Sequence, residues 1–294
     1  DGYIIPKNNN FFGEYVPAPE DNLKYISNFT GSAGFAVVLK KKKFMFVDGR
    51  YTTQAKIQCG KDYKVYTIPK EYPFNIFNNK NLNLGFDPRL HTERSLNRLF
   101  KNSFIKLIPI SENLIDTLWK RKKYLNSKPF YLIKNRDAGE KSENKISKLS
   151  KIIKLNKADY LFTTASENIA WLLNIRGHDT NYSPLPNSHA FINNNKEIIF
   201  FCNLKKINKS FSSKLGKKIK IYDFEELPNF ISNLSKKKIL IDVLTCSVFF
   251  KTIINKHNSI IEKQDPIYLL KSLKNQTEIK NSIKSHIYDG AALT

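Results

Sequence analysis

The sequence predicts an α/β protein built from two related domains, each a mixed β-sheet flanked by helices. Its 294 residues are enough for two domains of ordinary size. Hairpin patterns alternate with amphipathic helical patterns, which is typical of mixed sheets with helices on their faces. A repeat without gaps also relates residues 22–31 to residues 168–177, with asparagine and glycine at the same places.

A β-hairpin is the clearest element of the first half. Two runs rich in β-branched and aromatic residues, 35–39 and 44–48, flank the basic turn Lys40–Lys43. Gly31 and Gly34 precede the first run, where the chain must bend sharply or approach other backbone closely. The second run therefore leaves the segment Asp48-Gly49-Arg50 at a strand end.

The remaining elements of the first half follow in order from stop and cap signals. Pro6 ends the first strand, Asp21-Asn22 offers cap chemistry for a helix, and Gly60 provides a helix stop. Later, Asp87-Pro88 stops a strand and Thr92 caps a helix. The predicted strands are 3–6, 63–68, 82–86 and 104–110, the helices are 22–26, 52–60, 92–100 and 113–119, and the polar, basic segment 121–129 is a predicted linker.

The second half repeats this pattern. A long amphipathic helix is predicted over 138–158, and Ser166-Glu167-Asn168 caps the next helix. The apolar spacing from Pro266 onward predicts a helix that runs to the last residue. The other predicted strands are 159–164, 189–193, 197–202, 219–222 and 239–243, and the other predicted helices are 166–173, 225–234 and 246–255.

The repeat extends beyond the helix that defines it. We expect the hairpin strands 35–39 and 44–48 to correspond to 190–192 and 198–203. Residues 84–87 match 240–242 in the same way. Tyr25 and Trp171 are also equivalent, and both are predicted to fill their domain cores. Asp48-Gly49-Arg50, however, corresponds to Asn203-Leu204-Lys205, so only the first domain has an arginine there.

The formal charge of +23 and the pI near 9.7 are typical of nucleic-acid binders. The lysines, however, are spread along the whole chain, and asparagine and isoleucine are abundant as well. These three residue types share A/T-rich codons, so a compositional drift explains all three excesses. Arginine, the side chain preferred for binding phosphates and guanine edges, is scarce. We therefore favour drift over nucleic-acid binding.

Other patterns bear on the cellular compartment. No apolar run approaches the ~20 residues of a membrane-spanning helix, and Asp1–Pro6 lacks the pattern of a signal peptide. The three cysteines, Cys59, Cys202 and Cys246, are far apart and odd in number. They are predicted to be packed, reduced thiols, and the predicted location is the cytoplasm.

Several long motifs span nearly the whole chain; they are Tyr3–Pro6, Ser27–Gly34, Val47–Tyr51, Ser166–Gly177 and Glu278–Leu293. In their residues and in their order, these motifs resemble the N-terminal half of eukaryotic-type Xaa-Pro aminopeptidases (aminopeptidase P). The resemblance implies two creatinase-type N-terminal domains with a ribonuclease H-like motif. It places domain I at 1–126, domain II at 127–270, and the first helix of a truncated catalytic "pita-bread" domain at 271–294.

The resemblance also implies an activity for the full-length protein. That family is a group of metallo-exopeptidases that release the N-terminal residue from peptides with proline second, using metal-activated water. Two divalent ions, expected to be manganese, would be held by two aspartates, one histidine and two glutamates of the third domain. We expect no catalytic residue and no metal ligand in this chain, which should be inactive alone. Its domains would cover the active-site cleft and contact the substrate.

The resemblance implies partners and one site residue as well. The partners would be short Xaa-Pro peptides and, in the full-length protein, a second copy forming a homodimer; no membrane and no nucleic acid are expected. Arg50 would contact the bound peptide, since a guanidinium can hold a carbonyl or carboxylate through two donors. The alternative is a surface arginine that pairs with Asp48 or Asp87.

No other residue set carries a comparable signal. The histidines show no metal-ligand spacing, and His178, beside Asp179, is predicted to be an ordinary loop histidine. Ser32 lies between glycines without an identifiable base, which favours a backbone turn. Two alternative functions remain open: a prolidase or creatinase-like hydrolase on the same scaffold, and a basic adaptor that binds nucleic acid. Two full N-terminal domains argue against the first, and scattered lysines argue against the second.

Overall fold

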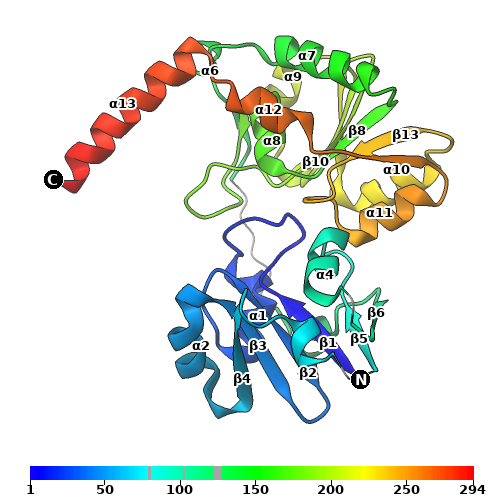
Figure 1. Ribbon diagram of the computed structural model, residues 1–294. Coiled ribbons are helices and arrows are strands. Elements are labelled where there is room, and N and C mark those ends of the chain that lie inside the picture. Colours follow the sequence, from blue (N-terminus) through cyan, green and yellow to red (C-terminus); the bar gives the residue numbers. More distant parts are fainter. Residues whose placement is uncertain (79–80, 102, 122–127) are drawn as a thin grey trace. The chain divides into compact units, whose positions relative to one another are not determined.

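The computed structural model describes residues 1–78, 81–101, 103–121 and 128–294. Its contacts divide the chain into a first unit, Asp1–Leu125 with Val243–Lys251, and a second unit, Asn126–Asp242 with Thr252–Thr294. Each unit is an α/β fold with one six-stranded mixed sheet (Figure 1). The predicted boundary between 126 and 127, and most of the predicted linker 121–129, lie outside the described residues.

The sheet of the first unit has the order β4-β3-β2-β1-β5-β6. Antiparallel pairs join β1 to β2 and β2 to β3, and parallel pairs join β3 to β4, β1 to β5 and β5 to β6. The predicted hairpin is confirmed, with Phe35 opposite Phe46 in the register. The strands are β1 (Gly2–Pro6), β2 (Gly34–Leu39), β3 (Lys43–Asp48), β4 (Tyr63–Ile68), β5 (Leu82–Phe86) and β6 (Ile105–Pro109).

Helices cover both faces of this sheet because strand side chains alternate between the faces. One face packs against α1 (Asn22–Ser27), α2 (Thr52–Cys59) and α5 (Leu114–Leu118) through Leu23, Ala55 and Ile115. The other face packs against α3 (Pro73–Ile76) through Ile76 and against α4 (Glu93–Phe100) through Leu96, Leu99 and Phe100. The remaining short helices of this unit are η1 (Ala18–Glu20), η2 (Gly49–Tyr51) and η3 (Gly60–Asp62).

The sheet of the second unit repeats the first strand for strand. Its order is β12-β11-β10-β8-β13-β14, with the same sequence of antiparallel and parallel pairs. The predicted internal duplication is therefore confirmed at the level of topology. The strands are β8 (Tyr160–Thr163), β10 (His189–Asn193), β11 (Ile198–Cys202), β12 (Ile219–Asp223), β13 (Lys238–Ile241) and β14 (Ser259–Glu262), and a small separate sheet joins β7 (Tyr131–Leu132) to β9 (Ile175–Arg176).

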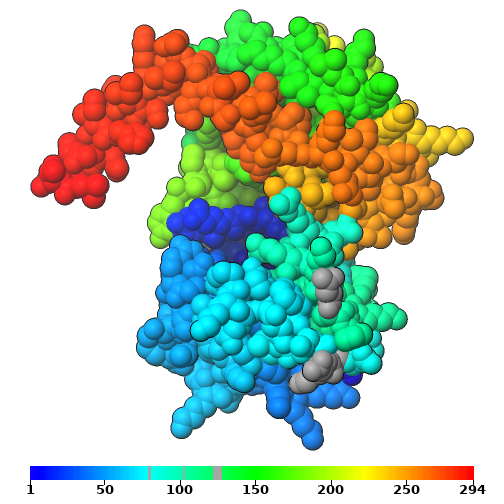
Figure 2. Space-filling view, in the orientation of Figure 1, coloured from blue at the N-terminus to red at the C-terminus, as the bar shows by residue number. Residues whose placement is uncertain are grey.

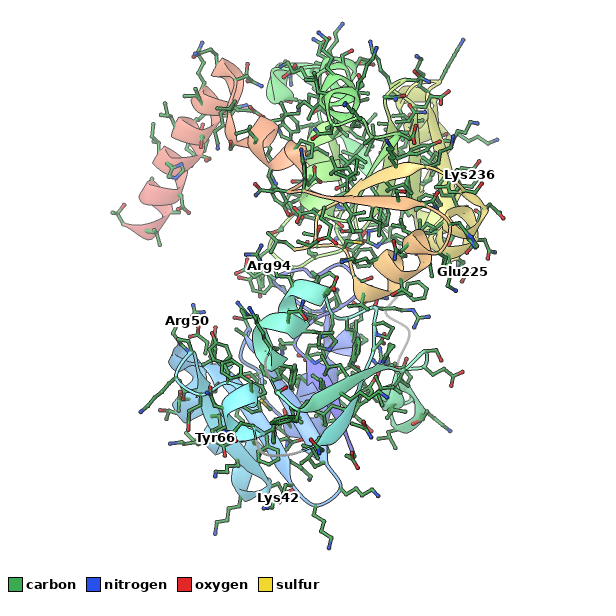
Figure 3. The ribbon with its side chains drawn as sticks, turned by 45° about the vertical axis from the view of Figure 1, so that its right-hand side comes forward. Lys42, Arg50, Tyr66, Arg94, Glu225 and Lys236 are labelled. Atoms are coloured by element: carbon green, nitrogen blue, oxygen red, sulfur yellow. The ribbon has the colours of Figure 1, made fainter. Side chains whose placement is uncertain are left out.

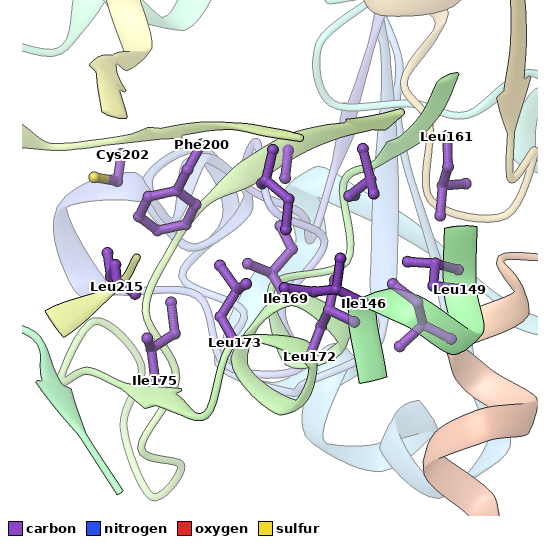
Figure 4. Close-up of a cluster of buried hydrophobic side chains, with 14 of the residues drawn as sticks. Ile146, Leu149, Leu161, Ile169, Leu172, Leu173, Ile175, Phe200, Cys202 and Leu215 are labelled. Carbon is purple, nitrogen blue, oxygen red and sulfur yellow. The ribbon is translucent and has the colours of Figure 1, made fainter. Parts of the chain in front are cut away.

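One core cluster of the second unit lies between the sheet and its helices (Figure 4). It combines Leu149 and Ile169 from helices with Leu161 and Phe200 from strands, all fully buried. The helices of this part of the chain are α6 (Asn135–Ala138), α7 (Ser142–Leu155), α8 (Ser166–Leu172), η4 (Leu204–Lys206), α9 (Lys209–Lys214), η5 (Phe224–Glu226), α10 (Leu227–Asn233), α11 (Val248–Asn255), α12 (Pro266–Ser272) and α13 (Gln276–Leu293).

Two predicted helices were wrong in extent. The helix predicted over 138–158 is divided, because Gly139 ends α6 in the left-handed conformation at φ 71° and α7 begins only at Ser142. The helix predicted from Pro266 onward is also divided. Asn275 caps α13 by accepting a hydrogen bond from the Glu278 backbone amide, so α12 and α13 are separate.

Other elements were missed because their sequence signals are short. These are α3, α9, the edge strand β14 and the two-residue strands β7 and β9. The predicted core position of Tyr25 was also wrong. Its side chain is 43% exposed and stacks on Trp119, with ring centroids 4.6 Å apart, whereas Trp171 is partly buried against the core of the second unit.

In the described part of the chain, no helix is both long and apolar enough to cross a bilayer. The longest of these helices, α13, projects from the rest of its own unit, as the space-filling view shows (Figure 2). Isoleucines at 279, 283 and 287 lie one turn apart along it and stay exposed.

Candidate functional site

The end of strand β3 positions Arg50, the residue that the family resemblance implies as a substrate contact. Asp48 closes the strand and caps the short helix η2, since its Oδ1 accepts a hydrogen bond of 3.0 Å from the Arg50 backbone amide. The same oxygen accepts a bond of 2.8 Å from Nε of the Arg50 side chain. That side-chain bond is the main cause that lowers the pKa of the Asp48 carboxyl below its ordinary value.

Arg50 remains accessible although it is paired. Its side chain is 72% exposed, and the bond to Asp48 uses Nε. The guanidinium carbon lies 5.4 Å from the ring centroid of Tyr51. Arg50 and Arg94 point outward at the end of the first unit opposite the Lys42 turn (Figure 3). An exposed pair of this kind stabilises the fold little, so the guanidinium can exchange Asp48 for another anion.

The sequence left open that Arg50 is a surface arginine paired with Asp48 or Asp87, and one of these two pairs is found. Arg50 pairs with Asp48, and the possible pairing with Asp87 was wrong. Asp87 instead accepts hydrogen bonds from the Arg89 backbone amide at 2.9 Å and from the Asn113 side chain at 3.1 Å.

The second unit contains the same turn without the arginine. Asn203 caps η4, and its Oδ1 accepts a hydrogen bond of 3.0 Å from the Lys205 backbone amide. The cap is thus common to both copies, whereas the carboxylate and the guanidinium occur only in the first. This agrees with the asymmetry in the sequence and identifies the turn as a scaffold on which the first copy carries the Asp48–Arg50 ion pair.

The Gly-rich segment before β2 lies beside this turn. A Cβ on Gly31 would lie 2.2 Å from Cζ of Phe29, so only glycine fits under that ring. Ser32 Oγ is 2.7 Å from the hydroxyl of Tyr51, the residue that follows Arg50. The structure therefore agrees with a backbone turn at Ser32 that packs against the Asp48–Tyr51 segment.

The histidines do not assemble a metal centre. Among the residues that the structure describes, no three His, Cys, Asp or Glu side chains come together in a group that could hold a metal ion. His91 and His189 are buried, and burial lowers their pKa to about 3 and about 4, which keeps both rings neutral. His178 is an exposed loop residue as predicted, and Asp179 beside it pairs with Lys206 instead.

No pattern in the sequence predicts the buried lysine of the second unit. Lys145 is only 1% exposed, and its ammonium donates to Asn174 Oδ1 at 2.8 Å and to the Trp171 carbonyl at 2.9 Å. It also lies 4.1 Å from the Trp171 ring centroid. Burial lowers the pKa of this ammonium to about 8. The indole of Trp171 in turn donates to Glu278 of α13 at 3.0 Å, so these residues connect α7, α8 and α13.

Comparison with known proteins assigns the chain to a family. A family model described as the creatinase/prolidase N-terminal domain matches residues 121–278, and another with the same description matches residues 1–118. The chain belongs to the creatinase/prolidase N-terminal domain family. It contains two such domains in tandem, as the sequence predicted from its repeat and motifs.

Xaa-Pro aminopeptidases are among the curated relatives that match nearly the whole chain. The chain is 28% identical to a probable Xaa-Pro aminopeptidase P of Coprinopsis cinerea over 100% of its own length and 51% of the relative. It is 29% identical to Xaa-Pro aminopeptidase 1 of Dictyostelium discoideum over 99% of its own length and 49% of the relative. The resemblance seen in the motifs is thus confirmed, and the chain spans about half the length of these curated relatives.

A solved structure agrees with both the fold and the coverage. The X-prolyl aminopeptidase of Caenorhabditis elegans, described as a cytosolic enzyme with a di-nuclear active site, superposes with a TM-score of 0.90 at 26% identity. The match covers 99% of this creatinase/prolidase N-terminal chain and 50% of the other. The predicted fold class of two mixed-sheet creatinase-type domains is therefore confirmed.

Proposed function

We propose that this chain forms the two N-terminal domains of a metal-dependent Xaa-Pro aminopeptidase, which releases the first residue from peptides with proline second. The observation that carries the proposal is that nearly the whole chain matches about half the length of such enzymes. The proposed boundaries are 1–126 for domain I, 127–270 for domain II and 271–294 for the first helix of the catalytic domain.

In this proposal the two domains do not perform the chemistry. They cover the active-site cleft, limit entry to short peptides and supply Arg50 as a substrate contact. The exposed guanidinium supports this role, because it keeps donors available for a peptide carbonyl or carboxylate. Its present partner, Asp48, is a neighbour on the same turn, so a peptide has only an exposed ion pair to replace.

The metal chemistry is assigned to another part of the full-length protein. Two divalent ions, which we propose are manganese, would activate the attacking water there. The described residues of this chain do not fit such a pair, because they contain no group of His, Cys, Asp or Glu with the required proximity. We further propose a cytoplasmic enzyme that forms a homodimer when full length.

A first experiment tests whether the chain has activity by itself. The purified 294-residue chain is incubated with divalent manganese and a peptide whose second residue is proline. We expect no release of the first residue above the rate without protein. Turnover that depends on manganese and survives further purification would refute the assignment of catalysis to another part.

A second experiment tests the role of Arg50 in the full-length protein that contains this chain. Arg50→Ala should lower kcat/KM by about tenfold or more, which corresponds to the loss of one charge-assisted contact, while metal content stays normal. Arg50→Lys should recover only part of the loss, since an ammonium lacks the planar pair of donors. Lys205→Ala, at the equivalent place in the second copy, is the matched control and should leave kcat/KM unchanged. Equal kinetics of Arg50→Ala and wild type would exclude the contact.

A further inference from the structure

The first unit contains a cavity at one end of its sheet. It has a volume of about 390 Å³ and is lined by residues at the carboxyl ends of β1, β3 and β4, together with residues around the start of α4. Strands β2, β3 and β4 lie on one side of β1 and β5 lies on the other, so the strand order reverses here. In open α/β sheets, ligands bind outside the carboxyl ends of strands at such a reversal.

A buried histidine without a partner lines this cavity. His91 is 2% exposed, and its Nε2 forms no hydrogen bond among the described residues. Its position is defined, since its carbonyl accepts a 2.8 Å bond from the Val248 amide and its ring packs edge-on to Phe86 at 5.6 Å. A buried polar atom that lacks a partner calls for a ligand, an ion or water to satisfy it.

The charges around the cavity leave one cation uncompensated. Lys7 pairs with Asp21, and Asp48 pairs with Arg50. Arg98, an exposed residue of α4 that also lines the cavity, forms no ion pair with any described residue. The site therefore favours an anionic ligand at its rim.

The identity of this cation is informative in a chain so rich in lysine. Only seven of the 49 basic residues are arginines, and Arg98 is one of them. A lysine would supply the same charge, whereas an arginine also supplies a planar pair of donors that matches a carboxylate. The rim is thus suited to a carboxylate more than to an anion of arbitrary shape.

The walls behind the rim are largely apolar. Phe35 and Phe46 stack across the hairpin with ring centroids 4.9 Å apart, and both line the cavity together with Leu99 and Ile68. Apolar walls with few polar groups are typical of sites for small molecules, and the volume lies within their usual range. A ligand with a carboxylate at one end and an apolar body would satisfy the rim and the walls together.

The second unit has different side chains at the corresponding places. By strand register, His189 of β10 replaces Phe35, and Phe224 follows β12 where Ile68 ends β4. The rings of His189 and Phe224 pack edge to face with centroids 5.8 Å apart. The duplicated fold therefore does not by itself require the arrangement found in the first unit.

We propose that this cavity is a binding site for a small carboxylate with an apolar body, held by Arg98 at the rim and by His91 inside. Two sources share this chemistry: a free apolar amino acid and the C-terminal residue of a short peptide. The site belongs to this chain alone and needs neither metal nor turnover. If no carboxylate binds in this cavity, the proposed peptidase function is unaffected. Equally, a result against the proposed peptidase function would leave this binding site unaffected.

The test uses the 294-residue chain with histidine labelled selectively with ¹⁵N, which gives five ring systems to follow by NMR. The probes are the tripeptide Gly-Pro-Leu, its C-terminal amide, and free leucine. We expect the peptide acid to shift the His91 ring signals, and its affinity to fall by about tenfold or more on amidation or in Arg98→Gln. Arg94→Gln, one turn away on α4 and outside the cavity lining, is the matched control and should bind as wild type does.

The free amino acid distinguishes the two sources. Leucine binding as tightly as the peptide acid would identify an amino-acid site, and binding of the peptide acid alone would identify a site for peptide C-termini. The proposal is overturned if about 10 mM of each carboxylate leaves the His91 signals unchanged, a concentration that detects even weak binding. It is also overturned if acid and amide bind equally, because the exposed Arg98 would then have no role.

Discussion

Asp48 Oδ1 accepts two hydrogen bonds from the same residue, one from the backbone amide of Arg50 at 3.0 Å and one from its side-chain Nε at 2.8 Å. The first bond caps a helix, and Asn203 makes the equivalent bond in the second unit. The second bond is electrostatic and has no counterpart there. The two roles of this carboxylate can therefore be separated by mutation.

Asp48→Asn should keep the cap and remove the charge. We expect a thermal unfolding midpoint close to that of wild type, because an exposed ion pair adds little stability. Asp48→Ala removes the cap as well and should unfold at a lower temperature than Asp48→Asn. Differential scanning calorimetry of the two variants gives the comparison. Asn203→Ala is the control for cap loss in the other copy, and equal midpoints for Asp48→Asn and Asp48→Ala would show that the cap contributes nothing.

The duplicated asparagines Asn28 and Asn174 offer a second matched pair. Both adopt the left-handed conformation, at φ 59° and φ 55°, where glycine is equally tolerated. Asn28 is exposed, but the side chain of Asn174 accepts from Lys145 and donates to the Glu140 carbonyl. Asn28→Gly should thus leave stability nearly unchanged, whereas Asn174→Gly should cost about 1–3 kcal/mol because buried groups lose partners.

Urea unfolding followed by tryptophan fluorescence measures both variants, since Trp119 reports on the first unit and Trp171 on the second. Similar free energies of unfolding for Asn28→Gly and Asn174→Gly would contradict the structural role assigned to the Asn174 side chain.

Lys145 should make the stability of the second unit depend on pH. Its pKa is about 8 in the folded chain against an ordinary value of 10.5, so between these values the unfolded state binds more protons. The free energy of unfolding should therefore rise as pH rises from about 8 to about 9.5, with a slope of at most about 1.4 kcal/mol per pH unit. This gain is lost as pH falls through the folded pKa.

The measurement is urea unfolding at several pH values in a Trp119→Phe background, which leaves Trp171 as the reporter. Lys145→Met removes the titrating group and should flatten the slope, whatever its own stability. An identical slope in Lys145→Met and the background protein would assign the pH dependence to other groups.

The three cysteines should be protected in the folded chain. Cys59, Cys202 and Cys246 are all buried, and burial raises the pKa of Cys59 and Cys202. Because the thiolate is the reactive form, a disulfide reagent should modify all three slowly at pH 7.5, and Cys202, with no exposed surface, most slowly. In guanidinium chloride all three should react at once. Rapid modification of Cys202 in the native chain would contradict its burial.

Much of the fold could be predicted from the sequence because its signals are local. The strands at 63–68 and 82–86 and the helix capped by Asp21 depend on side-chain alternation and a cap within a few residues. The repeat between 22–31 and 168–177 then predicted that both halves share one architecture, and the two sheets have the same strand order. The family also followed from the motifs, since their residues are contiguous in the chain.

Other features depended on which distant residues meet. Sequence periodicity does not distinguish the long helix predicted over 138–158 from α6 and α7, because the left-handed turn at Gly139 is held by packing against Asn275 and Thr277. The position of Tyr25 was wrong for the same reason, as the opposing Trp119 lies far along the chain. Burial of Lys145 depends on its hydrogen bond to Asn174. The two residues are far apart in the sequence, so a local pattern does not predict this contact.

The class of fold, the tandem repeat and the single arginine at the end of β3 follow from the sequence alone, because each depends on residue type and short spacing. In contrast, the folded structure was needed to show that Asp48 accepts hydrogen bonds from both the backbone and the side chain of Arg50, and that His91 and Arg98 line one cavity. Partners and burial are properties of residues brought together from separate strands and helices. Packing decides which of these residues come into contact, and a local sequence pattern carries no information about packing.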